Sequence, residues 1–195
     1  MKIKKAHFVK GVAKGKQDWN PQFPHIAFYG RSNAGKSSTI NAIVNNKKLA
    51  KTSAMPGKTK EINLFLLNDS HYLVDLPGYG FASVSKVKQE KLGQLIAWYI
   101  KDIQVDRRVH VIVSDSKVGL TDLDLATLDA LYATGEPIVI LLNKIDKLKK
   151  NEIAQVFQDT KSKVAGMVQI RPFSAKKRDG VDDLIRDISH VLNQI

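Results

Sequence analysis

The sequence predicts an α/β fold of three layers, in which a mostly parallel six-stranded sheet with one antiparallel strand carries helices on both faces. One supporting observation is that short apolar runs alternate along the chain with segments whose apolar residues recur at helical spacing. The other is a hairpin signal, because the apolar segments 61–67 and 71–76 are separated by Asn68-Asp69-Ser70. Strands joined through helices form a parallel sheet, and a hairpin adds one strand of the opposite direction.

The chain is predicted to consist of a basic N-terminal extension, residues 1–22, and one domain, residues 23–195. The extension carries six lysines against one aspartate and ends in proline-containing loop signals. Further strands are expected at 26–29, 109–113, 138–142 and 167–173. Helices are expected at 36–46 and 92–103, after Thr121, from Ile153 onward and at 181–195. Thr121 and Asp124 have the spacing of a helix N-cap and its partner.

Composition excludes several classes of protein. Apolar residues make up 43% of the chain and charged residues 26%, which is typical of a globular domain. The absence of cysteine excludes disulfides and thiolate metal sites. No apolar stretch of signal-peptide length follows the basic N-terminus, and the most apolar run, Ile138 to Leu142, is far shorter than the ~20 residues of a membrane span. We expect a cytoplasmic monomer with no membrane partner.

The charge of the chain suggests a partner. The sequence has 31 Lys and Arg residues against 19 Asp and Glu residues, a net charge of +12. A solvated surface needs a smaller excess than this. We therefore expect a polyanionic partner, with RNA the first candidate.

A phosphate-binding pattern, G-x-x-x-x-G-K-[ST], lies between the strand expected at 26–29 and the helix expected at 36–46. Its residues and the one that follows are Gly30, Arg31, Ser32, Asn33, Ala34, Gly35, Lys36, Ser37 and Ser38. The glycines let backbone N–H groups turn toward phosphate oxygens, and the start of the helix adds its positive dipole end. Lys36 is expected to reach the β- and γ-phosphates, and the Ser37 hydroxyl to be a Mg²⁺ ligand.

The base-recognition motif is Asn143-Lys144-Ile145-Asp146, which follows a buried strand at the carboxyl edge of the sheet. The carboxylate of Asp146 can accept hydrogen bonds from guanine N1–H and N2–H₂, and adenine offers no such pair. Asn143 can bond O6 or N7, and the methylene stem of Lys144 can pack over the base. Ser174-Ala175-Lys176, after the last strand, can donate a backbone N–H to O6. These residues predict binding of GTP and GDP.

Two further segments are expected to respond to the γ-phosphate. Asp75-Leu76-Pro77-Gly78 ends a strand, so that Asp75 can hold Mg²⁺ through water and the Gly78 N–H can contact the γ-phosphate. Thr59, in Gly57-Lys58-Thr59, is the candidate threonine that closes directly on Mg²⁺ when GTP is bound.

These five elements occur in the order and spacing of the P-loop GTPase (Ras-like) fold. Within it, residues 23–195 resemble the EngB/YihA/YsxC family of bacterial GTP-binding proteins, in the TrmE–Era–EngA group. The resemblance is carried by the residues from Gly30 to Ser38, by Thr52-Ser53 with Pro56-Gly57-Lys58-Thr59, and by Val74-Asp75-Leu76-Pro77-Gly78-Tyr79-Gly80-Phe81. Two departures are Asn143, where the family often has Thr, and Ser114-Asp115-Ser116-Lys117, which lacks the common Asp-x-Arg.

The resemblance implies a cytoplasmic GTPase that is needed for cell division and septation and acts in assembly of the large ribosomal subunit. Many GTPases place a water-orienting Gln directly after Asp-x-x-Gly, where this chain has Tyr79. We therefore expect slow intrinsic hydrolysis. Relatives with Asn at the position of Asn33 resemble K⁺-dependent GTPases, which makes Asn33 a candidate K⁺ ligand.

Two alternatives remain. The chain can be a nucleotide-gated protein scaffold of the division machinery with no direct ribosome role, although the net charge favours an RNA partner. It can also be an ATP-dependent kinase or ATPase, which Asn143 and Asp146 oppose.

Overall fold

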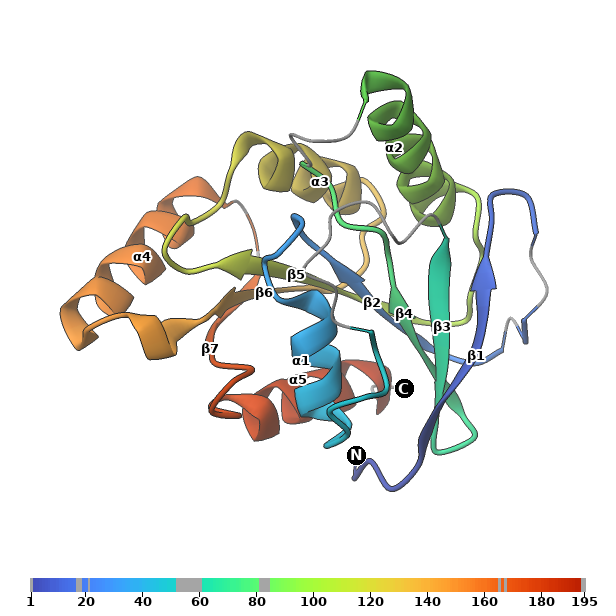
Figure 1. Cartoon of the computed structure of the whole chain (residues 1–195), viewed down its shortest axis with the longest axis horizontal. Coiled ribbons are helices and arrows are strands. Elements are labelled where there is room, and N and C mark those ends of the chain that lie inside the picture. The colour runs from blue at the N-terminus through green and yellow to red at the C-terminus, as the bar shows by residue number, and fades with distance from the viewer. Residues whose placement is uncertain are drawn as a thin grey trace.

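The computed structural model shows one twisted sheet with helices on both of its faces (Figure 1). It describes residues 2–16, 19–20, 22–51, 61–80, 85–164, 166 and 168–193. The strands are β1 (Ala6–Val12), β2 (His25–Tyr29), β3 (Ile62–Leu67), β4 (His71–Asp75), β5 (Arg108–Asp115), β6 (Ile138–Asn143) and β7 (Gln169–Phe173). The helices are α1 (Lys36–Ile43), α2 (Lys86–Lys101), α3 (Asp122–Tyr132), the 3₁₀ turn η1 (Ile145–Lys147), α4 (Lys150–Lys163) and α5 (Val181–Asn193).

The predicted three-layer, mostly parallel architecture is confirmed. The strand order is β1-β3-β4-β2-β5-β6-β7, and β3 pairs antiparallel with both of its neighbours while the other pairs are parallel. Of the strands in the described residues, β3 alone therefore runs against the rest. One core cluster joins the sheet to α2 and α3, and the other joins the opposite face to α1 and α5. Strand β2 serves both, because Ala27 and Tyr29 point to the first cluster and Ile26 and Phe28 to the second.

The predicted number of strands, six, is wrong, because the described residues contain seven. The additional strand is β1, which lies within the segment 1–22 that was expected to be an extension. It pairs antiparallel with β3 from Ala6 opposite Leu67 to Val12 opposite Ile62. As an edge strand it exposes Phe8 and Val9 and carries Lys10, and charge on an edge strand hinders pairing with other chains. The lysines that flank the strand within residues 1–22 concealed it from sequence reasoning.

The parallel strands point their carboxyl ends to one edge of the sheet, where the expected nucleotide motifs follow β2, β4, β6 and β7. Helix α3 begins with the capping box predicted from Thr121 and Asp124. None of the helices within the described residues has both the length and the apolar character that a membrane span requires.

Candidate functional site

The phosphate loop connects β2 to α1 and depends on two glycines with left-handed backbones. Gly30 has φ 144° and Gly35 has φ 104°. A Cβ atom on Gly30 would collide with the backbone carbonyl of Val113, and one on Gly35 would collide with the side-chain amide of Asn143. The sequence must therefore have glycine at both positions for the loop to lie against β5 and β6.

The structure brings Lys36 together with the residues that follow β4. The Lys36 side chain is buried, and its Nζ donates to the carbonyl of Gly30 over 3.1 Å. Burial lowers the pKa of Lys36, and the neighbouring carboxylates of Asp75 and Asp124 oppose that shift. A Cβ atom on Gly78 would lie 3.0 Å from Lys36 Nζ, so this glycine admits the ammonium group. Of the remaining loop residues, Asn33 and Ser38 are exposed, and Arg31, Ser32 and Ser37 are half-buried.

Asp75, the last residue of β4, carries a buried carboxylate with an unused oxygen. Burial raises its pKa to about 6, and Lys36 and a hydrogen bond with Ser37 act in the opposite direction. Within the described residues its Oδ1 has no hydrogen-bond partner. An unpartnered carboxylate oxygen beside a serine hydroxyl is the donor chemistry that Mg²⁺ and its water ligands accept. The residues present therefore fit a magnesium ion.

Asn143, the last residue of β6, joins two loops of the site. Its side chain is buried, its Nδ2 donates to the Ala34 carbonyl over 2.9 Å, and its Oδ1 accepts the Ala175 N–H over 3.1 Å. The sequence-based role for this amide was a hydrogen bond to the base. In the structure the amide fastens the phosphate loop to the loop that follows β7, and its hydrogen bond to the base stays a prediction.

Asp146 and Lys144 each contact one of the two loops that Asn143 joins. The Ser174 hydroxyl donates to Asp146 Oδ1 over 2.7 Å, and this hydrogen bond lowers the pKa of Asp146, so that the carboxylate stays charged. Lys144 has φ 71°, and its Nζ donates to the Asn33 carbonyl over 2.6 Å and pairs with Asp115 over 2.7 Å. The phosphate and guanine motifs thus meet through side-chain contacts.

Several residues on which the predictions rest fall outside the part of the chain that the structure describes. Gly57, Lys58 and Thr59 lie outside the described residues, as do Thr52-Ser53, Pro56 and Phe81, which carried part of the resemblance. Lys176 is exposed beyond Ser174.

Sequence reasoning missed a contact between Tyr79 and Asp124. Tyr79 follows Gly78, and its hydroxyl donates to Asp124 Oδ1 over 2.8 Å. The other oxygen of Asp124 accepts from the N–H and the hydroxyl of Thr121, over 3.0 and 2.8 Å. The Tyr79 carbonyl in turn accepts the Ser32 N–H over 2.9 Å. Tyr79 therefore links the phosphate loop to the start of α3, and its hydroxyl is engaged there. The capping-box spacing identified Asp124 as a cap, but no local pattern indicated this second partner.

Comparisons with known proteins agree with the site. The family described as "50S ribosome-binding GTPase" matches residues 25–144. A protein called "Probable GTP-binding protein EngB" from Petrotoga mobilis is 41% identical over 194 residues, covering 98% of each chain. This chain belongs to the EngB family of GTP-binding proteins. A second EngB protein, from Oceanobacillus iheyensis, is 37% identical over 197 residues and matches over the full length of both chains.

Solved structures show the same fold. A crystal structure of "a probable GTP-binding protein engB" superimposes with a TM-score of 0.71 at 27% identity, covering 86% of this chain and 97% of the other. Era from Aquifex aeolicus, bound to GDP·AlF₄⁻, has a TM-score of 0.70 at 22% identity, covering 88% of this chain and 57% of Era. The EngB family assignment accounts for a GTPase domain with guanine-nucleotide binding, and P-loop GTPases generally use Mg²⁺ with the nucleotide.

The Tyr79–Asp124 contact predicts that Tyr79→Phe distinguishes the two nucleotide states. Loss of the hydroxyl frees the segment after Gly78, which we expect to respond to the γ-phosphate, so affinity for a non-hydrolysable GTP analogue should fall about tenfold, a typical value for a hydrogen bond to a charged acceptor. Affinity for GDP should change by less than about twofold, because GDP lacks that contact. Nucleotide titrations of the unaltered protein and of Tyr79→Phe measure the two affinities. Tyr72→Phe, which removes a hydroxyl that accepts the Asn20 N–H, is the matched control and should affect neither affinity. Equal losses of affinity for GDP and for the GTP analogue in Tyr79→Phe would contradict a role of Tyr79 that is specific to the GTP-bound state.

Proposed function

We propose that this EngB-family protein is a GTP-hydrolysing switch whose GTP-bound form docks on RNA of the large ribosomal subunit. The observation that carries the nucleotide part is that Asn143 fastens the phosphate loop to the loop after β7. The first of these loops leads to Lys36, which lies beside Asp75, and the second holds Asp146 through Ser174. The partner part is supported by the family description "50S ribosome-binding GTPase" and by the net charge of +12. The protein is proposed to act in the cytoplasm as a monomer.

Each residue of the site has a proposed part in nucleotide binding. The N–H groups of the phosphate loop and the Lys36 ammonium bind the phosphates, and Asp146 accepts from the guanine edge. Lys144, whose Nζ donates to the Asn33 carbonyl, covers the base with its methylene stem. Ser37 and Thr59 would hold Mg²⁺ directly and Asp75 would hold it through water. Bound there, Mg²⁺ supplies neutralisation of phosphate charge. Thr59 and Gly78 change position with the γ-phosphate.

Slow hydrolysis is part of the proposal. The Tyr79 hydroxyl is held by Asp124, so this side chain does not orient water at the γ-phosphate. Asn33 is exposed with φ 64° at the outer edge of the phosphate loop, in reach of solvent cations. We propose that K⁺ bound by Asn33 supplies the positive charge that other GTPases take from an arginine finger.

The dependence of GTP hydrolysis on the monovalent cation tests the proposed role of Asn33. GTP hydrolysis should be faster in K⁺ than in Na⁺ at equal ionic strength, by about tenfold or more if the ion does the work of one transition-state contact. Asn33→Ala should remove the difference while leaving GDP affinity intact. Phosphate release measured in both salts provides the comparison. Equal rates for the unaltered protein in the two salts would exclude the cation role.

Base specificity has its own test in Asp146→Asn. The carboxylate pairs with two guanine donors, so the amide should lower GDP affinity by about tenfold to a hundredfold and permit xanthine nucleotides, which present an acceptor at C2. Competition of labelled GDP by GDP, XDP and ADP measures both effects. Ser174→Ala should show a smaller loss, because it removes only the hydroxyl that donates to Asp146. A wild-type preference for GDP in Asp146→Asn would remove Asp146 from the site.

The proposed RNA surface lies beside the guanine motif. Arg178, in the loop after β7, donates to Asn45 Oδ1 and so holds this loop against the segment that follows α1. Basic residues are exposed on both segments: Lys47, Lys48, Lys51, Lys176, Lys177 and Arg178. Side chains of one charge gathered in this way are suited to a phosphate backbone.

Sedimentation tests the ribosomal partner. The protein should sediment with large ribosomal subunits in the presence of a non-hydrolysable GTP analogue, and less in GDP or raised salt, because each neutralised phosphate releases counterions. Changing Lys47, Lys48 and Lys51 to Glu should weaken docking and leave GDP affinity intact. Changing Lys86, Lys88 and Lys91 on α2 to Glu gives a matched control, with the same charge change on another exposed surface.

A second candidate function is a nucleotide-gated scaffold of the division machinery. Under the favoured proposal, effects on cell division and septation follow from ribosome supply. Binding to subunits that ignores both salt and the three lysines after α1 would favour the scaffold instead.

A further inference from the structure

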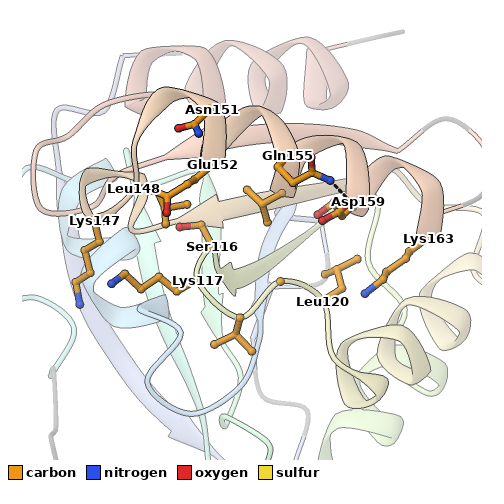
Figure 2. A pocket seen from close by; sticks show the side chains of 14 residues that line it. Ser116, Lys117, Leu120, Lys147, Leu148, Asn151, Glu152, Gln155, Asp159 and Lys163 are labelled. Carbon is orange, nitrogen blue, oxygen red and sulfur yellow. Dashed lines mark hydrogen bonds between the residues drawn. The ribbon is translucent and has the colours of Figure 1, made fainter.

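A second cavity lies outside the nucleotide site, between α4 and the loop that joins β5 to α3 (Figure 2). Its volume is about 700 Å³, which lies within the range of small-molecule sites. Residues 116–120 form one wall, and residues from Lys147 to Lys163 form the other. The cavity is of a size to hold a nucleotide or a comparable metabolite.

Two buried hydroxyl groups on opposite walls of this cavity lack partners. Ser116 is 3% exposed and Thr160 is 1% exposed, and within the described residues neither Oγ of Ser116 nor Oγ1 of Thr160 has a hydrogen-bond partner. A threonine inside a helix commonly bonds the carbonyl one turn back, yet Thr160 does not. Buried hydroxyls left unsatisfied are costly, so each is a position at which a bound polar group would gain a hydrogen bond.

The charges around the cavity favour an anion. Figure 2 shows Lys117 and Lys147 at one end and Lys163 at the other. Within the described part of the chain, these three ammonium groups form no hydrogen bond or salt bridge. The lining also includes two carboxylates: Glu152 accepts the Lys149 N–H over 2.6 Å, and Asp159 accepts from Gln155 over 2.8 Å. Three ammonium groups against two carboxylates leave the lining with a net charge of +1.

The cavity wall is also continuous with the guanine site. The Ser116 N–H donates to the Asn143 carbonyl over 2.8 Å, and the Lys117 N–H donates to Asp115 over 3.0 Å. Asp115 is the ion-pair partner of Lys144. Val118 and Gly119 line both this cavity and a smaller one of about 130 Å³ beside the phosphate loop. A ligand that shifts Ser116 therefore acts on Asn143 directly, and one that shifts Lys117 acts on Lys144 through Asp115.

We propose that this cavity is a second ligand site, which takes a small phosphate-bearing molecule of up to nucleotide size and changes the affinity of the guanine site when filled. The ammonium groups of Lys117, Lys147 and Lys163 bind the phosphates, and the hydroxyls of Ser116 and Thr160 bind polar groups of the ligand. The proposal needs only the nucleotide binding of the family and is independent of the ribosomal role.

Binding of adenosine 3′,5′-bisphosphate to the protein saturated with GDP and Mg²⁺ tests the site, because an adenine compound does not enter the guanine pocket. Calorimetric titration should give a Kd below about 1 mM. Lys163→Gln should weaken binding about tenfold, the effect of losing a hydrogen bond between charged groups. Lys161→Gln is the matched control, since Lys161 is an exposed lysine of the same helix outside the cavity. No binding, or equal effects of the two substitutions, would overturn the proposal.

Thr160→Val separates ligand binding from a structural role. The substitution keeps the shape of the side chain and removes an unpartnered hydroxyl, so the Tm should stay equal or rise while affinity for the bisphosphate falls about fivefold. A Tm that falls clearly, with unchanged affinity, would show that the hydroxyl serves the fold and would overturn the assignment.

Two further measurements address coupling and the source of the phosphate. At saturating bisphosphate the dissociation rate of labelled GDP should change by about fivefold or more, and an unchanged rate would overturn the coupling to the guanine site. A single-stranded RNA pentanucleotide should bind no more tightly than the bisphosphate. Much tighter RNA binding with the same dependence on Lys163 would assign the cavity to nucleic acid and overturn the small-molecule proposal.

Discussion

The buried amide of Asn143 is the contact on which the site depends. It stands at the end of β6, where one side chain reaches the phosphate loop through Ala34 and the loop after β7 through Ala175. The backbone carbonyl of the same residue holds Ser116 after β5. Three loops from separate parts of the sequence are thereby fixed by one residue. Because the amide is buried, losing either hydrogen bond would leave a polar group without a partner, at a cost of about 1–3 kcal/mol.

A second junction, at Asp124, connects the segment after Gly78, which is predicted to respond to the γ-phosphate, to helix α3. Its carboxylate accepts a hydrogen bond from Tyr79 on one oxygen and from the N-cap residue Thr121 on the other. A shift of Tyr79 would therefore alter the N-cap of α3. Both junctions contact the phosphate loop, because Tyr79 accepts the Ser32 N–H and Asn143 donates to the Ala34 carbonyl. The segments predicted to recognise guanine and the γ-phosphate thus both hold the phosphate loop. A loop that is held in place favours binding because its order is established before the ligand arrives.

The sequence predicted the parts of this arrangement that have a local cause. Apolar runs and turn residues placed the hairpin of β3 and β4, and the spacing of Thr121 and Asp124 predicted the capping box. Strand β1 escaped because the lysines that flank it resemble a solvated tail, and only its pairing with β3 shows that it belongs to the sheet. The contacts of Asn143 with Ala34 and of Tyr79 with Asp124 join residues 109 and 45 positions apart, which no periodicity encodes. The cavity beside α4 depends on how this helix packs next to the loop that joins β5 to α3, and it leaves no trace in the sequence.

Amide hydrogen exchange on Asn143→Ala tests most directly whether this one side chain unites the site. With GDP bound, exchange should become faster both in the phosphate loop and in residues 174–177, and GDP affinity should fall by about tenfold to a hundredfold, as expected for two lost hydrogen bonds in a buried site. Asn41→Ala is the matched control, because Asn41 is another buried asparagine and its amide bonds Lys47 and Ala50 in the segment after α1, not the loop after β7. It should leave residues 174–177 protected. Faster exchange confined to residues 174–177 in Asn143→Ala, with the phosphate loop and GDP affinity unchanged, would contradict the account.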